Sequence, residues 1–107
     1  NKKIIIVESI GDLLALWDAE IKNVIVSFGL DISSQLLNFF LKIDPNEVIL
    51  SFNNDEANNS AGNKAADKAF NKLNKYFDSK QIKIILPDKK DFGEMNKKEI
   101  INWQKKI

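Results

Sequence analysis

The chain has 107 residues, enough for one domain with its own core, and its 44% hydrophobic and 29% charged content is ordinary for a globular protein. It contains neither Cys nor His, which excludes disulfides and His-dependent catalysis and leaves carboxylates, Lys, hydroxyls or a metal ion held by oxygen ligands. The net charge is +1 and all sixteen basic residues are Lys, so the chain has no global basic field for nucleic acid and no Arg to clamp phosphate.

The first third of the chain predicts two strands around one helix. Lys3 to Val7 is a β-branched run that predicts a buried strand, and Glu8 ends it. Ser9 to Asp12 then forms a tight turn, in which Asp12 suits a helix N-terminus. The apolar face of the following helix is expected from Leu13, Leu14, Leu16 and Trp17. Residues 24–26 are the second predicted strand.

The middle of the chain predicts a second helix, a third strand and a long third helix. Residues 31–34 offer N-caps for the second helix, which Pro45 ends. Its expected apolar residues are Leu36, Leu37, Phe40 and Leu41. A short apolar strand over 47–52 then changes abruptly to Asn53, Asn54, Asp55 and Glu56. After a small polar loop, apolar residues recur at helical spacing at positions 65, 66, 69, 70, 73, 76 and 77.

The last third predicts a fourth strand over 82–85, a loop over 86–93 and an amphipathic helix over 96–106. The complete pattern alternates strand and helix four times. Such alternation predicts an α/β, Rossmann-like fold with a four-stranded parallel sheet and helices on both faces. We expect the first and third strands to be neighbours in this sheet.

Acidic residues follow three of the four predicted strands. Glu8 follows the first and Asp91 lies beyond the fourth, while Asp55 follows the third together with Asn53. Asp12 lies one helical turn after Glu8. The carboxyl ends of parallel strands share one edge, where ligands of α/β folds bind. Carboxylates gathered there repel one another unless a divalent cation relieves the repulsion, although polar turn residues at this edge are also common.

Several segments in the right order resemble the Toprim family. The segment IIIVESIGD (residues 4–12) is similar to its strand, Glu and downstream Asp, and ILSFNNDEA (residues 49–57) is similar to its Asp-x-Asp motif. GNKAA (residues 62–66) resembles the helix start that follows in bacterial-type primases. Leu86-Pro87 with KDFGE (residues 90–94) resembles their LP…KD segment. The resemblance covers nearly the whole chain and favours the primase branch, with a primase or primase-helicase of phage or plasmid type.

Two features depart from the family pattern. Asn53 replaces the first acid of the Asp-x-Asp motif, which keeps an oxygen ligand but removes a negative charge, and residues 58–61 are inserted before the Gly. The resemblance implies that Glu8, Asp12, Asn53, Asp55 and Asp91 hold Mg²⁺ or Mn²⁺, with Glu8 and Asp55 catalytic. It further implies that Lys64, Lys89 and Lys90 meet phosphates, although a Lys is more often a solvated surface residue. Trp17 and Trp103 are interpreted as packing residues rather than base-stacking platforms.

The resemblance implies template-directed synthesis of RNA primers, a nucleotidyl transfer, by a DNA primase or primase-helicase. The partners would be single-stranded DNA, nucleoside triphosphates and a replicative helicase. Three alternatives stay open: a Toprim nuclease, a receiver-like phosphoacceptor domain, and a Toprim-derived binding module that has lost catalysis, for which Asn53 argues. Acetyl-phosphate labelling of Asp55 would favour the receiver.

No apolar run approaches the ~20 residues that span a membrane, and nothing at the N-terminus resembles a signal peptide. We therefore expect a cytoplasmic protein without a membrane partner. The chain starts at Asn1 without an initiator Met. Residues 1–107 are accordingly expected to be a single Toprim domain, a fragment of a longer primase-like protein.

Overall fold

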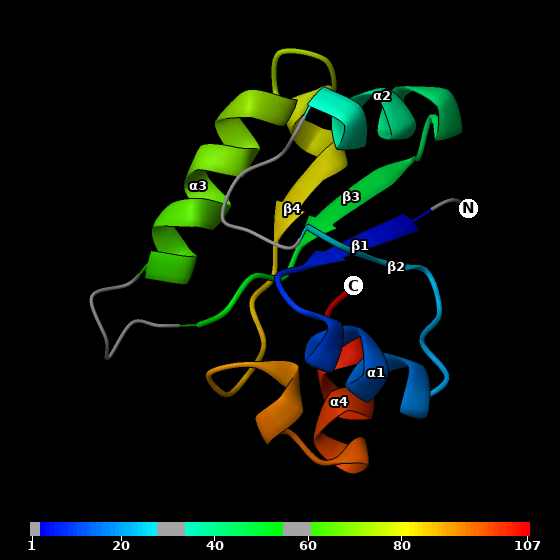
Figure 1. Ribbon diagram of the computed structural model, residues 1–107, viewed down its shortest axis with the longest axis vertical. Helices are drawn as coiled ribbons and strands as arrows, with labels where there is room; N and C mark the ends of the chain where they lie inside the picture. The colour runs from blue at the N-terminus through cyan, green and yellow to red at the C-terminus, as the bar shows by residue number, and fades with distance from the viewer. Residues whose placement is uncertain (1–2, 28–33, 55–60) are drawn as a thin grey trace.

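The structure, a computed structural model, describes residues 3–27, 34–54 and 61–107 as an α/β fold built on one sheet (Figure 1). The four strands are β1 (Lys3–Val7), β2 (Val24–Val26), β3 (Glu47–Leu50) and β4 (Ile82–Ile84). The described helices are α1 (Ile10–Asp18), α2 (Ser34–Ile43), α3 (Ala61–Leu73) and α4 (Lys97–Gln104), with short 3₁₀ helices η1 (Ser79–Gln81) and η2 (Phe92–Glu94). The predicted fold class is therefore confirmed.

The strands lie in the order β2-β1-β3-β4, and every neighbouring pair is parallel. At the centre of the sheet, Ile5 lies opposite Val24 on one side and Ile49 on the other. The predicted adjacency of the first and third strands is thus confirmed. Because the strands are parallel, the chain leaves β1, after Val7, and β3, after Leu50, at the same edge.

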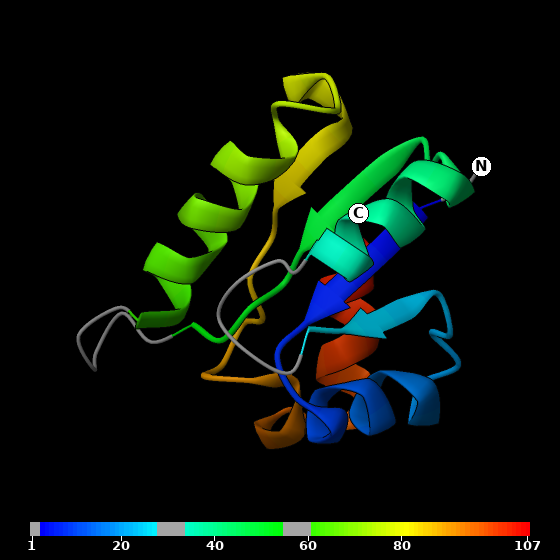
Figure 2. The same ribbon diagram turned by 45° about the horizontal axis from the view of Figure 1, so that its top comes forward.

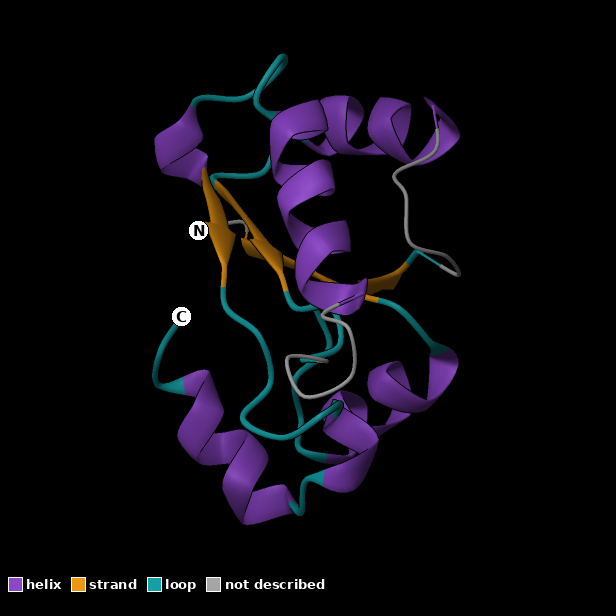
Figure 3. Ribbon diagram, turned by 90° about the vertical axis from the view of Figure 1, so that its left-hand side faces the viewer, coloured by secondary structure: helices purple, strands orange, loops and turns teal. Residues whose placement is uncertain are grey.

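Helices cover both faces of the sheet. Figures 1 and 2 show α2 and α3 on one face and α1 and α4 on the other, and Figure 3 shows these layers edge-on. Strand side chains alternate between the two faces. The α2/α3 layer packs on Ile6, Val48 and Leu50, and the α1/α4 layer packs on Ile5, Val7 and Ile49. With both faces covered, the two central strands are apolar over residues 4–7 and 48–50, whereas β4, at the edge of the sheet, carries the exposed Lys83.

Helix α1 differs from the prediction in its start and in its buried face. Ser9 is the N-cap, and its hydroxyl accepts from the Asp12 backbone N–H at 3.4 Å, so Asp12 lies inside the first turn. Leu16 is buried as predicted, whereas Leu14 and Trp17 are 60% and 47% exposed. The apolar residues of α1 are distributed around most of the helix, so their spacing in the sequence did not define a single buried face. Leu41 and Tyr76, predicted as core residues of later helices, are likewise exposed.

The end of α1 requires a left-handed backbone conformation. Glu20 has a φ of 66°, and its N–H bonds to the Trp17 carbonyl while the Ile21 N–H bonds to the Leu16 carbonyl. Leu16 and Ile21 also share one core cluster. This pair of hydrogen bonds, with its apolar contact, is the Schellman ending, at which glycine is the usual left-handed residue.

Glu20→Gly should therefore stabilise the domain by about 0.5–1 kcal/mol. The substitution removes the steric cost of holding an L-residue in the left-handed conformation, and this gain is larger than the entropy cost of ordering a glycine. The exposed Glu20–Lys22 pair, at 3.6 Å, is lost as well but contributes little. Urea denaturation measures the change. Glu20→Ala is the matched control, since it removes the same ion pair but keeps a Cβ, and it should not stabilise. Equal effects of the two variants would contradict the backbone explanation.

Within the described segments, no helix combines the length and the apolar character required to cross a bilayer.

Candidate metal centre

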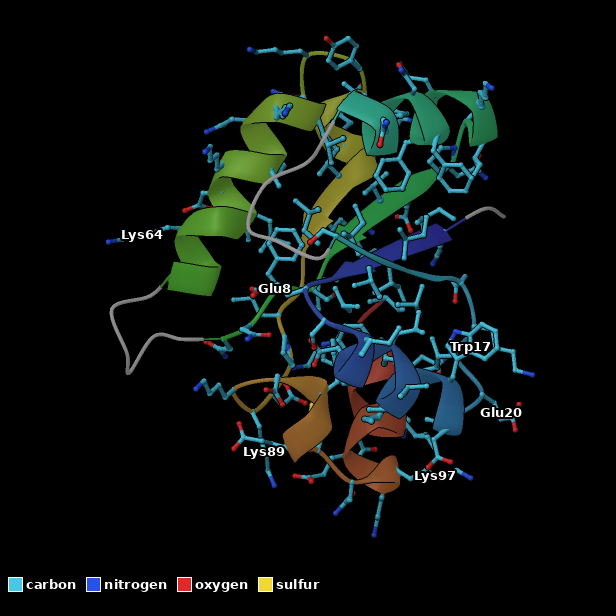
Figure 4. The ribbon with its side chains drawn as sticks, viewed as in Figure 1. Glu8, Trp17, Glu20, Lys64, Lys89 and Lys97 are labelled. Atoms are coloured by element: carbon cyan, nitrogen blue, oxygen red, sulfur yellow. The ribbon has the colours of Figure 1, made fainter. Side chains whose placement is uncertain are left out.

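The first predicted site residue, Glu8, lies directly after β1 and contacts the segment that follows β3. Its Oε1 accepts a hydrogen bond from the Asn53 backbone N–H at 2.8 Å. Figure 4 shows Glu8 near the middle of the molecule, where β1 and β3 end. The adjacency of these strands brings together two residues 45 positions apart. Glu8 and Asn53 therefore lie at one point of the sheet edge.

Asn53 presents a polar atom that the rest of the described chain leaves unsatisfied. Its side-chain Oδ1 is buried and has no hydrogen-bond partner among residues 3–27, 34–54 and 61–107. A buried acceptor without a partner is costly and rare, so it calls for an explanation. An amide oxygen is a normal ligand of Mg²⁺ or Ca²⁺. This oxygen belongs to the residue whose backbone N–H contacts Glu8, and its chemistry fits a hard divalent cation.

The loop between β4 and η2, residues 85–91, is held against the end of β3 by two residues of that segment. Ser51 Oγ donates to the Ile85 carbonyl at 2.8 Å. Asn54 donates twice, from its backbone N to the Lys90 carbonyl at 2.7 Å and from Nδ2 to the Pro87 carbonyl at 3.2 Å. The residue after Lys90 is Asp91. The third predicted acid is therefore placed beside the same segment that contacts Glu8.

Asp91 also begins η2. Its Oδ1 accepts from the Glu94 backbone N–H at 3.0 Å, as an N-cap does. The loop is held from the α4 side too, because Trp103 Nε1 donates to the Leu86 carbonyl at 2.9 Å. Trp103 is fully buried, and its ring meets the Phe92 ring edge-on with centroids 4.7 Å apart. The packing role predicted for Trp103 is thus confirmed.

Asp12 is deeply buried, with 2% of its surface exposed. Its Oδ1 accepts from the Phe92 backbone N–H and its Oδ2 from the Ser9 hydroxyl, each at 3.0 Å. Burial raises the pKa of the Asp12 carboxyl, the hydrogen bonds from Ser9 and Phe92 lower it, and the nearby charge of Asp91 raises it. A raised carboxyl pKa means that the folded state binds this proton more readily, so the contribution to stability falls as the pH rises through the folded-state pKa.

The predicted ligand set is only partly described by the structure. Asp55 lies outside the described residues, as does Glu56. Among the described residues, no three acidic side chains converge as a metal-binding group. The structure brings Glu8, Asn53 and the Asp91 loop to one edge, and the metal-binding role of these residues stays a prediction.

The three predicted phosphate-binding lysines are all exposed. Lys64 lies in the first turns of α3, and Figure 4 shows that it points outward, away from Glu8. Lys89 also points outward, and its Nζ pairs with Glu99 at 3.2 Å. Lys90 follows it in the same loop, and its carbonyl accepts from Asn54. The role of these residues toward phosphate remains a prediction.

Sequence reasoning missed the residues that assemble this edge without belonging to the predicted set. Asn54 fastens the loop before Asp91 through both its backbone and its side chain, and Ser9 supports Asp12. An amide residue in the segment that follows β3 was the available signal for Asn54. A backbone donor such as the Phe92 N–H leaves no signal in a sequence, because every residue except proline has one.

The predicted packing role agrees less well with the structure at Trp17 than at Trp103. It is 47% exposed, and the Nζ of Lys22 lies 5.8 Å from its ring centroid, within the range of a cation–π contact. Figure 4 places it on α1, far from Glu8. It therefore lies outside the edge described above.

A comparison with protein-family models matches residues 5–96 to the family described as Toprim-like. The chain belongs to the Toprim-like family. This match, together with a sheet of four parallel strands, favours the Toprim interpretation over the receiver-like phosphoacceptor domain. No curated protein sequence matches the chain significantly.

Solved structures of primases share the Toprim-like fold of this chain. A DnaG catalytic core superposes with a TM-score of 0.75 at 21% identity over 99% of this chain, and a DNA primase domain from Pseudomonas aeruginosa with 0.72 at 22% over 89%. The primase fragment of the bacteriophage T7 primase-helicase protein gives 0.69 at 22% over 96%. The matched region is 34%, 29% and 44% of those chains, respectively, so this chain corresponds to less than half of each.

Proposed function

We propose that this domain is the metal-binding catalytic part of a DNA primase, which makes RNA primers on single-stranded DNA by nucleotidyl transfer. The observation that carries the proposal is the contact of Glu8 with Asn53, which joins the two sequence motifs at one edge beside a buried, unsatisfied amide oxygen. The fold that the chain shares with primase cores supports the primase branch of the family.

Glu8, Asn53, Asp55 and Asp91 would hold one or two Mg²⁺ or Mn²⁺ ions. The chemistry that such a cation supplies is polarisation of the incoming triphosphate and a lower pKa for the attacking 3′-hydroxyl. Within the chain, Glu8 keeps its carboxylate at the edge through the Asn53 N–H, and Asn54 keeps the Asp91 loop in place. Lys64, Lys89 and Lys90 would meet phosphates as point charges.

The proposed partners are nucleoside triphosphates and a single-stranded DNA template, bound by the whole protein in the cytoplasm. A net charge of +1 and an acidic catalytic edge give this domain little affinity of its own for phosphate backbones. We therefore place most template contacts outside this chain. A replicative helicase is a further proposed partner, which the likeness to a primase-helicase fragment supports.

Asn53→Asp should tighten Mg²⁺ binding by about tenfold, because a carboxylate adds a full charge to a ligand position at which the amide supplies only a dipole. The same charge should lower the melting temperature of the metal-free protein through repulsion with Glu8, and raise that of the metal-bound protein. Calorimetric titration with Mg²⁺ or Mn²⁺, beside thermal melts with and without metal, measures both effects.

Asn71→Asp is the matched control. It adds the same charge at an exposed position near the C-terminal end of α3. It should leave metal affinity unchanged. Equal affinities of wild type and Asn53→Asp would place Asn53 outside the metal ligands. A wild-type protein that responds to no metal at tens of millimolar and makes no primers would support the non-catalytic binding module instead. Metal-dependent DNA cleavage without primer synthesis would support the nuclease.

A further inference from the structure

Asp12 is a buried carboxylate that joins α1 to the loop beyond β4. Both of its oxygens accept hydrogen bonds from within the protein, one from the Phe92 N–H and one from the Ser9 hydroxyl, each at 3.0 Å. Burying a carboxylate is costly, and among the described residues the partners of this carboxylate are neutral hydrogen-bond donors rather than cations. The position of this carboxylate therefore calls for a role that an ordinary core residue would not fill.

The peptide that Asp12 holds is the one between Asp91 and Phe92. The peptide on the other side of Asp91 is held as well, because the Lys90 carbonyl accepts from the Asn54 N–H at 2.7 Å. The two peptide groups that flank the Asp91 Cα are thus fixed independently, one from the segment that follows β3 and one from α1. With both planes fixed, the direction of the Asp91 Cα–Cβ bond is fixed too, and the bond that Asp91 Oδ1 accepts from the Glu94 N–H at 3.0 Å holds the carboxylate itself.

We propose that Asp12 is a positioning residue, which keeps the Asp91 carboxylate at the acidic edge by holding the 91–92 peptide, and that it is not itself a metal ligand. The inference rests on the proposed function, in which Asp91 is a ligand. It revises the sequence interpretation that placed Asp12 among the ligands. Residues that orient a ligand commonly matter almost as much as the ligand itself, and their loss lowers metal affinity by about 10- to 100-fold.

The Asp12→Asn variant distinguishes a role of Asp12 in positioning Asp91 from a role as a metal ligand. In Asp12→Asn the amide oxygen still accepts the Phe92 N–H, and the amide NH₂ can donate to the Ser9 hydroxyl, while the negative charge is lost. In Asp12→Ala both hydrogen bonds are lost. We therefore expect Asp12→Asn to bind Mn²⁺ within about threefold of wild type, and Asp12→Ala to bind at least about tenfold more weakly. Asp91→Asn, which neutralises the positioned group, should also weaken binding.

The experiment measures Mn²⁺ affinity of the complete protein and its three variants by water-proton relaxation, with hydrogen exchange of the Phe92 amide as a second readout. The Phe92 amide should be protected in wild type and Asp12→Asn and unprotected in Asp12→Ala. If Asp12→Asn weakens Mn²⁺ binding as much as Asp91→Asn does while Phe92 stays protected, Asp12 is a ligand and the positioning role is overturned. Should Asp12→Ala fail to fold, the comparison of wild type with Asp12→Asn decides by the same criterion.

The hydrogen-exchange readout also separates this inference from the proposed function. If wild type binds no Mn²⁺, the proposed function loses its basis, while exchange at Phe92 still reports whether Asp12 holds the loop. Equal protection of Phe92 in wild type, Asp12→Asn and Asp12→Ala would overturn the positioning role whatever the metal result.

Discussion

The Glu8→Gln protein should synthesise primers about 10²- to 10³-fold more slowly than wild type, because under the proposed function a bound cation contributes several kcal/mol to transition-state stabilisation and the substitution removes one of its anionic ligands. Glutamine preserves the shape of the side chain, and its amide oxygen can still accept the Asn53 N–H. The fold should therefore survive, and the loss should appear in activity. The measurement is the initial rate of labelled ribonucleotide incorporation on single-stranded DNA with saturating Mg²⁺.

Glu20→Gln is the matched control for this variant. Glu20 lies just beyond the other end of α1, and Figure 4 shows it on the outside of the molecule, far from Glu8. The same change of charge at this position should leave the rate within about twofold, as expected of an exposed residue. A Glu8→Gln protein that retains a third or more of wild-type activity would remove Glu8 from the metal site.

Trp103→Ala should destabilise the domain by about 3–5 kcal/mol, the cost of truncating a fully buried large aromatic side chain. The substitution removes the packing against Phe92 and also leaves the Leu86 carbonyl without its donor. Urea denaturation of the variant and the wild type measures the difference. A domain of ordinary stability would retain only a small part of its free energy of unfolding after this loss.

Two further variants separate the causes of this destabilisation. Trp103→Phe keeps a ring against Phe92 but removes the donor to Leu86, and it should cost about 1–3 kcal/mol. Ile101→Ala changes a 42% exposed residue of the same helix and should cost less than about 1 kcal/mol. Comparable losses at positions 101 and 103 would mean that α4 does not pack as described.

The first strand was predictable from the sequence because a parallel strand buried on both faces is a continuous run of β-branched residues. Lys3–Val7 was predicted with the observed bounds, and the position of Glu8 beside the Asn53 segment followed once the first and third strands were taken as neighbours. The burial of α1 was not predictable, because Leu13, Leu14, Leu16 and Trp17 satisfy more than one helical face. Only the tertiary structure selects the face that carries Asp12 and Leu16.

The supporting contacts of the candidate site could not be predicted for a different reason. Asp12 was recognised as an acid near Glu8, but its partner is the backbone of Phe92, and the path of the chain decides which backbone amide lies there. The same holds for the carbonyls of Pro87 and Lys90, which Asn54 reaches. Side-chain chemistry can be read from a sequence, whereas the backbone groups that complete a site depend on the fold.

The hydrogen bond from Phe92 to Asp12 joins residues 80 positions apart, and this separation has a consequence for the order of folding. Contacts between distant residues require the closure of long loops and form late. A chain emerging from the ribosome can pair β1 with β3, and so bring Glu8 beside Asn53, before residues 91 and 92 have left the ribosome. The loop that carries Asp91 thus reaches the edge beside Glu8 only after β1 and β3 are able to pair.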